Sequence, residues 1–210
     1  MSLTFKALAV AAATIAITAL SNLASPEARA DDMCDDVYSI VVGGAKISAA
    51  GTWQSSEDLI GDFPVGYDIL YPTQGLANLD AAVQRRKAEC PGGHITIMGH
   101  SEGAAIVHAW VTRNKYIDGV NAVLLSDPKR AAGPGSAGLS SVPGNQLVGY
   151  PLSGVDADFG TVPVLTICQH DDIVCNAEAG WNGYLYGGAH GRYNFDARYY
   201  GTDWQGVIFL

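Results

Sequence analysis

The sequence predicts an α/β fold built on a central, mainly parallel sheet of five strands. Short apolar runs rich in β-branched residues, typical of strands buried on both faces, recur along the chain. Segments with apolar residues at helical spacing lie between several of these runs. Strands that alternate with helices form parallel sheets through right-handed crossovers, so we expect helices packed on a layered sheet.

The expected elements follow one another in a regular order. Strands are expected at 37–42, 67–71, 94–98, 120–126 and 162–168. Pro72 would end the second strand because proline lacks a backbone donor. Helices are expected over 76–89 and 102–114, and the Gly-, Ser- and Pro-rich stretch 131–160 is expected to be a long ordered loop.

Length and composition exclude several classes of protein. The chain has 210 residues, of which 48% are hydrophobic, and this suits one domain with a sizeable core. Its formal net charge is −9, so no nucleic acid is expected as a partner, because such a partner needs a basic face. An anionic membrane surface is disfavoured for the same reason. No extended amphipathic pattern requires an oligomer, and a monomer is expected.

The first 30 residues have the pattern of a secretory signal peptide. Lys6 is followed by an apolar run over 7–20 and then by the small-residue site Ala28-Arg29-Ala30. The run is shorter than the ~20 residues that span a bilayer, which favours cleavage over a retained anchor. We therefore expect a single mature domain, 31–210, that is secreted, either free outside the cell or attached to the cell envelope.

The candidate nucleophile is Ser101, in the segment Gly99-His100-Ser101-Glu102-Gly103. This G-x-S-x-G pattern is weak on its own, but here an apolar strand precedes it and a helix follows it. A nucleophile elbow needs that context, because the sharp turn holds the serine hydroxyl above the edge of the sheet. The alternative is a glycine turn whose serine caps the helix.

A serine nucleophile needs a base, and the base needs an acid that orients it. In this architecture the acid and then the histidine follow the serine along the chain. Of the five histidines only His190 lies beyond every acid candidate, in the glycine-rich loop 187–191. The alternative for His190 is an ordinary surface position. The other four are His94, His100, His108 and His170.

The acid is expected just past the end of a late strand. Asp171 and Asp172 both follow the fifth strand, and spacing alone leaves both open. Asp127, after the fourth strand, is a weaker candidate because it is more typical of a turn before proline. A metal site built from His170, Asp171, Asp172 and His190 is disfavoured because their spacing matches no metal motif. We expect no metal and no cofactor.

Four cysteines lie beyond the signal peptide, at positions 34, 90, 168 and 175. An even number in an exported chain indicates two disulfides, and four cysteines allow three pairings. Zinc binding is disfavoured because the chain has no paired C-x2-C motifs.

These motifs resemble the cutinase family of serine esterases, with a related likeness to the actinobacterial PE-PPE serine hydrolases. Cys90 stands eleven residues before Ser101, as in the family's C-x10-S spacing. The block Cys168-x3-Asp172-x2-Cys175 is similar to the one that carries the family's catalytic aspartate. The segment 189–193 resembles the family's histidine segment.

The resemblance covers 34–193 and implies a three-layer α/β-hydrolase without a large lid. It implies Ser101, Asp172 and His190 as the catalytic triad. It also implies the disulfides Cys34–Cys90 and Cys168–Cys175. The first pairing has separate support, because both cysteines immediately precede buried parallel strands and would lie at the same edge of the sheet.

The resemblance also places the oxyanion hole, which needs two N–H donors. Glu102 supplies one because it follows the nucleophile, and Ala45 falls where the family has its second. Ala45 lacks the hydroxyl side chain that is common there, and Glu102 stands where the family usually has glutamine. An extra carboxylate beside a developing oxyanion is unfavourable unless it points away or is protonated.

The sequence therefore predicts a secreted hydrolase of carboxylic esters that forms an acyl-enzyme on Ser101. The expected substrates carry short or medium acyl chains on a lipid, polyester or acylated polymer, because the short mature chain leaves little room for a lid. Candidate walls of the site are Tyr71, Ile173, Val174, Leu185 and Tyr186. Two alternatives stay open: a thioesterase or acyltransferase with the same triad, and a weakly active or inactive binding protein on this fold.

Overall fold

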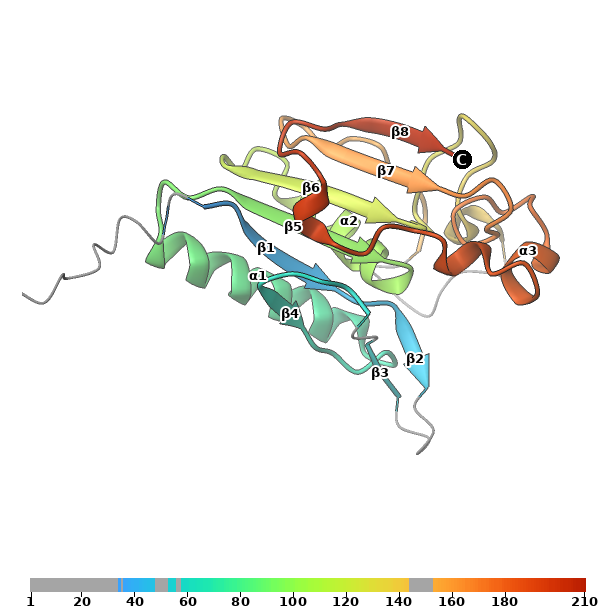
Figure 1. Cartoon of the computed structure of the whole chain (residues 1–210), viewed down its shortest axis with the longest axis horizontal. Helices are drawn as coiled ribbons and strands as arrows, with labels where there is room; N and C mark the ends of the chain where they lie inside the picture. The colour runs from blue at the N-terminus through green and yellow to red at the C-terminus, as the bar shows by residue number, and fades with distance from the viewer. Residues whose placement is uncertain (1–33, 35, 48–52, 56–57, 144–152) are drawn as a thin grey trace, which may run out of the picture.

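A six-stranded parallel sheet forms the centre of the computed structural model, which describes residues 34, 36–47, 53–55, 58–143 and 153–210. The strand order is β4-β1-β5-β6-β7-β8 (Figure 1). The strands are β1 (Tyr38–Val42), β4 (Phe63–Val65), β5 (Ile95–His100), β6 (Val120–Leu125), β7 (Val164–Cys168) and β8 (Gly206–Phe209). The prediction of an α/β fold on a mainly parallel sheet is confirmed, with six strands in place of five.

Two parts of the sheet differ from the sequence-based expectation. The strand expected at 67–71 is replaced by β4, which ends at Val65, and Pro72 begins a helix instead of ending a strand. Proline suits that position because the first N–H groups of a helix have no intrahelical partner. Strand β8 and the short antiparallel hairpin of β2 (Ala45–Ile47) and β3 (Trp53–Ser55) have no counterpart in the expectation.

One face of the sheet is covered by the helices α1 (Pro72–Glu89) and α2 (Glu102–Arg113). Leu79 of α1 and Ile106 and Trp110 of α2 are almost completely buried there. They pack in one apolar cluster with Ile40 of β1 and Ile97 of β5. Alternate residues of a strand point to opposite faces of the sheet. The residues next to Ile40 and Ile97 in their strands therefore contact the layer on the other face.

The second face of the sheet is covered by irregular chain. Val41 and Met98 point to this side and are buried in a second apolar cluster. Ala197 and Tyr200 complete the cluster from the segment that contains the short 3-10 helix η4 (Ala197–Tyr199). The third layer is therefore thin, and the inner strands β1, β5, β6 and β7 remain buried on both faces as their apolar runs predict.

The parallel strands end at one edge of the sheet, and the candidate site residues lie there (Figure 1). Ser101 follows β5, and Asp172 lies in the loop after β7. The 3-10 helix η3 (Ala189–Gly191) carries His190, and the short helix α3 (Trp181–Leu185) lies beside it. In open α/β sheets, ligand sites form beyond the carboxyl ends of the strands.

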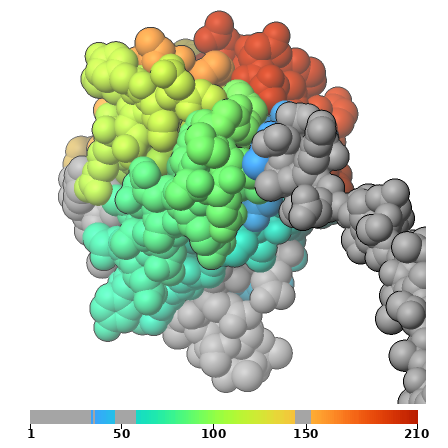
Figure 2. All heavy atoms as spheres, turned by 90° about the vertical axis from the view of Figure 1, so that its left-hand side faces the viewer, coloured from blue at the N-terminus to red at the C-terminus, as the bar shows by residue number. Residues whose placement is uncertain are grey.

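Two disulfides brace the sheet at opposite ends. Cys34 and Cys90, which form the first disulfide, precede β1 and β5 in the chain. The starts of these strands lie toward the end of the molecule that faces the viewer in Figure 2. Cys168–Cys175 closes the loop that carries Asp172. These are the two pairings that the resemblance implied.

The predicted signal peptide, 1–30, lies outside the described residues. Within the described part of the chain, no helix is long and apolar enough to cross a membrane.

Candidate active site

Ser101 occupies a strained turn between β5 and α2. Its φ is 58° and its ψ −123°, a conformation that costs energy for any residue with a Cβ. Its backbone N–H donates a hydrogen bond to the carbonyl of Leu125, at the end of β6 (3.0 Å). The structure thus places Ser101 in the strand–turn–helix context that a nucleophile elbow requires.

Glycines allow this turn to pack tightly against the sheet. A Cβ on Gly99 would come within 2.6 Å of the Ala104 Cα. A Cβ on Gly103 would overlap the carbonyl oxygen of Val42, at the end of β1. The first turn of α2 therefore rests directly on backbone atoms of β1, which holds the elbow in position.

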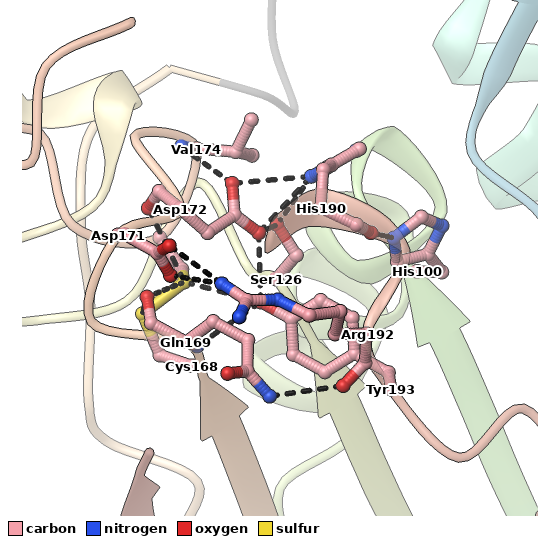
Figure 3. A network of polar contacts seen from close by, with 11 residues as sticks. His100, Ser126, Cys168, Gln169, Asp171, Asp172, Val174, His190, Arg192 and Tyr193 are labelled. Carbon is pink, nitrogen blue, oxygen red and sulfur yellow. Dashed lines mark hydrogen bonds and ion pairs between the residues drawn. A yellow bond between two sulfur atoms is a disulfide. The ribbon is translucent and has the colours of Figure 1, made fainter. Parts of the chain in front are cut away.

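His190 and Asp172 form a direct hydrogen-bonded pair (Figure 3). The Nδ1 atom of His190 lies 3.0 Å from Oδ2 and 3.2 Å from Oδ1 of Asp172. The Asp172 side chain is completely buried, whereas the imidazole of His190 is 19% exposed. A buried carboxylate that holds Nδ1 leaves the other ring nitrogen, Nε2, available to a reacting group.

The Asp172 carboxylate has further donors around it. The hydroxyl of Tyr193 donates to Oδ2 at 2.7 Å, and the N–H of Val174 donates to Oδ1 at 3.1 Å. Burial by itself would raise the pKa of Asp172, but hydrogen bonds from His190, Ser126 and Tyr193 outweigh it and hold the pKa below its ordinary value. The acid is therefore ionised at neutral pH in spite of its burial.

His100 links His190 to the turn that carries Ser101. Its Nε2 lies 2.9 Å from the backbone carbonyl oxygen of His190, which can only accept, so Nε2 carries the hydrogen. The two imidazole rings are 4.6 Å apart between centroids. Burial lowers the pKa of His100 to about 4, so the ring is neutral at physiological pH. Sequence reasoning missed this role; the one available signal was the place of His100 next to Ser101.

The two other acids considered from the sequence lie outside this arrangement. Asp171 forms an ion pair with Arg192, and its side chain is 30% exposed. Asp127 accepts a 2.7 Å hydrogen bond from Nδ1 of His108, and both of these side chains are buried. Asp172 is the acid candidate that contacts the candidate base.

A family model for cutinase matches residues 67–203, a range that contains the elbow, the acid loop and η3. The chain belongs to the cutinase family. The expectation of a cutinase-like α/β-hydrolase is confirmed, and with it the class of carboxylic-ester hydrolase. No curated protein matches the chain.

Two solved structures are similar to this cutinase-family chain. A cutinase-like protein from Cryptococcus sp. is 16% identical, and the match covers 70% of this chain and 83% of that one with a TM-score of 0.50. Est1E from Butyrivibrio proteoclasticus, solved with ferulic acid bound, is also 16% identical; that match covers 84% and 80% of the two chains with a TM-score of 0.42. The first likeness shows the fold.

Two residues are expected at the oxyanion hole of this cutinase-family chain: Glu102, which directly follows Ser101, and Ala45. Ala45 is exposed, opens β2 and pairs with Ser55 of β3. Gly44, just before it, packs against Ser101: a Cβ there would come within 2.9 Å of the serine Cβ. Glu102 begins α2, and burial, with a smaller effect of Asp68, raises its pKa to about 7.

The two remaining histidines bond to groups outside this arrangement. His94 donates to the side-chain oxygen of Asn121, and His170 donates to the backbone carbonyl of Leu210. Among the residues that the structure describes, no group of three or more His, Cys, Asp and Glu is placed to hold a metal ion. A cavity of about 660 Å³ lies at the starts of β1 and β5, at the opposite end of these strands from Ser101. Its lining includes Ser39, whose hydroxyl donates to Asp62 (2.8 Å), and contains no histidine.

Proposed function

We propose that the chain is a secreted serine esterase that works through an acyl-enzyme, with Ser101, His190 and Asp172 as its catalytic triad. The observation that carries this proposal is the buried Asp172 carboxylate bonded to His190, whose backbone is in turn bonded to the residue next to Ser101. The predicted signal peptide and the two disulfides support export to an oxidising compartment.

Each member of the proposed triad has a distinct role. Ser101 attacks the carbonyl carbon of the ester while Nε2 of His190 accepts the hydroxyl proton. The tetrahedral intermediate collapses as the C–O bond to the alcohol breaks, and the imidazolium returns the proton to that alcohol. Water then repeats both steps on the acyl-enzyme and releases the acid. Asp172 holds the imidazole through Nδ1 and stabilises its positive charge.

The proposed oxyanion hole consists of the backbone N–H groups of Glu102 and Ala45. The N–H of Glu102 lies at the amino terminus of α2, where the helix dipole contributes positive partial charge. Removal of one such preorganised donor lowers kcat by about 10²–10³-fold.

Exposed apolar side chains beside the site favour esters held on a lipid or polymer surface. Tyr184 of α3 packs against the His190 ring in a tilted arrangement (4.8 Å between centroids), and Leu185 and Tyr186 follow it with mostly exposed side chains. On the elbow side, Leu70 and Tyr71 are exposed in the loop that precedes α1. Ile173 and Val174, also expected as walls, are instead buried in a small apolar cluster. An open site between apolar loops suits short and medium acyl chains.

Covalent labelling tests the proposal without knowledge of the natural ester. A fluorophosphonate probe is expected to add once to the mature chain at neutral pH, and intact-mass and peptide mass spectrometry should place the adduct on Ser101. The Ser101→Ala variant should take up no probe. A wild-type chain that stays unlabelled would favour the alternative of an inactive binding protein.

A panel of p-nitrophenyl esters of increasing acyl length would then define the substrate class. Thioester hydrolysis and transfer to added alcohols, measured alongside, separate the thioesterase and acyltransferase alternatives. Highest kcat/KM on short or medium oxygen esters is the expected result.

The carboxyl group of Glu102 is expected to make the esterase lose activity at alkaline pH. With a pKa of about 7, Glu102 is neutral below that pH and gains a negative charge above it, next to the developing oxyanion. Glu102→Gln keeps the shape without the charge, so its kcat/KM should exceed that of the wild type by about tenfold at pH 9 and match it near pH 5. A ratio of the two kcat/KM values that stays constant from pH 5 to 9 would contradict this role.

A further inference from the structure

Ser126 is a second serine held in a strained backbone conformation at the same edge of the sheet. Its φ is 52°, and in the described part of the chain Ser101 and Ser126 are the two non-glycine residues with positive φ. Ser126 follows β6 directly, and its N–H donates to the carbonyl of Ile167 in β7 (3.0 Å). Strain of this kind clusters at functional sites, because the surrounding structure must hold it.

The hydroxyl of Ser126 lies between the acid and the base (Figure 3). Its Oγ is 2.5 Å from Oδ2 of Asp172 and 2.9 Å from Nδ1 of His190. An ionised carboxylate only accepts, so the hydroxyl proton goes to Asp172 and the Oγ lone pair is left to face the Nδ1 hydrogen of His190. Ser126 is completely buried, so no water competes for these contacts.

We propose that Ser126 is a positioning residue, whose hydroxyl fixes the Asp172 carboxylate and shares the Nδ1 hydrogen of His190. This inference rests on the proposed function. Glycine would adopt the same backbone conformation without strain, so a strained serine at this position indicates that its hydroxyl is what the site uses.

The hydroxyl should also moderate how strongly Asp172 attracts the imidazolium. Ser126 and Tyr193 both donate to Oδ2, and this draws negative charge away from the hydrogen bond with His190. The other groups that face the His190 ring are His100 on β5, which is neutral at physiological pH, and Tyr184 on α3. Loss of the Ser126 donor would therefore leave a more basic carboxylate that holds the protonated base more tightly.

Two variants separate the hydroxyl from the backbone. Ser126→Ala removes Oγ and keeps the strained Cβ, whereas Ser126→Gly removes both. Each is expected to lower kcat for a p-nitrophenyl ester by about 10–100-fold with little change in KM. Each should also move the acid limb of the pH–rate profile upward by about half to one pH unit. The thermal midpoint of the glycine variant should be at least that of the alanine variant, because glycine relieves the strain.

Ser140→Ala is the matched control. Ser140 is also a buried serine, but within the described residues its Oγ has no hydrogen-bond partner. Its replacement should leave kcat and the acid limb unchanged.

A measurement that needs no catalysis keeps the inference separate from the proposed function. In the Ser101→Ala background, the low-field proton resonance of His190 Nδ1–H should shift when Ser126 is replaced by glycine and stay in place in Ser140→Ala. An unshifted resonance, together with a wild-type pH profile in Ser126→Gly, would overturn the positioning role. A shifted resonance in a chain whose wild type neither hydrolyses esters nor takes up the probe would overturn the proposed function and leave the positioning role standing.

Discussion

Replacement of Asp172 by asparagine is expected to lower kcat for ester hydrolysis about 10⁴-fold. The amide has nearly the same shape as the carboxylate, so the buried network keeps its packing. It carries no negative charge, however, and it can present an N–H₂ group to Nδ1 of His190 where the structure has an acceptor. The imidazole then favours the tautomer with its hydrogen on Nε2, which cannot accept the proton of Ser101.

The neighbouring residue provides the matched control for this prediction. Asp171→Asn removes a carboxylate that is one position away, partly exposed and paired with Arg192. An exposed ion pair contributes little, so kcat should change by less than about fivefold. Steady-state hydrolysis of a p-nitrophenyl ester measures both variants. Equal losses in the two, or a larger loss in Asp171→Asn, would refute the assignment of Asp172 as the triad acid.

The order of strands and helices was enough to predict that these loops lie at one edge of the sheet. Spacing alone left both aspartates open, and the family resemblance is what favoured Asp172. Strands that alternate with helices must run parallel, so the ends of β5 and β7 lie at one edge, and this brings the loops with Ser101 and Asp172 together. Residues 171 and 172 follow β7 equally well in the sequence. The direction in which each side chain leaves the loop decides which of them contacts His190, and that direction depends on tertiary contacts.

The residues that we propose to position the triad could not be found from the sequence, for a related physical reason. His100 bonds to a residue 90 positions away, and Ser126 bonds to residues 46 and 64 positions away. The sequence around His100 and Ser126 gives no sign of a positive φ or of a bonding partner far along the chain. The edge strand β8 is a different case: its four residues, GVIF, form a short apolar run that could have predicted it, although its side chains are mostly exposed in the structure.

The expected strand at 67–71 shows how a local pattern can mislead. Tyr67 is buried as a strand residue would be, but its hydroxyl bonds to the carbonyl of Gly43 (2.8 Å), which holds this segment beside the elbow as an irregular loop. The β-propensity of a residue reflects how well its side chain packs on a half-buried surface. A residue in a buried loop can have the same kind of side chain, so this local pattern does not distinguish the loop from a strand.

Replacement of Gly103 by alanine is expected to displace the elbow and destabilise the whole domain. The new Cβ would overlap the backbone carbonyls of Val42 and Gly43, and backbone atoms at the end of a central strand cannot move aside as a flexible side chain can. Overpacking of this kind costs about 3 kcal/mol or more in the free energy of unfolding. For a domain of this size that corresponds to a fall of roughly 6–12 °C in the thermal midpoint. A shift of the α2 terminus by about 1 Å would also slow labelling of Ser101 about 10²-fold.

Gly92→Ala is the control that isolates the steric cause. Gly92 lies in the turn before β5, where a Cβ would meet nothing within 4 Å, and its backbone does not need the conformation that favours glycine. The same substitution there adds the same methyl group, so its thermal midpoint and its rate of probe uptake should match those of the wild type. If Gly103→Ala behaved like Gly92→Ala in both measurements, the close packing of α2 on β1 would not be what holds Ser101 in its strained conformation. A lowered midpoint with normal labelling would assign this contact to stability alone, and the strain at Ser101 would then have to be maintained by the bond from its N–H to the Leu125 carbonyl.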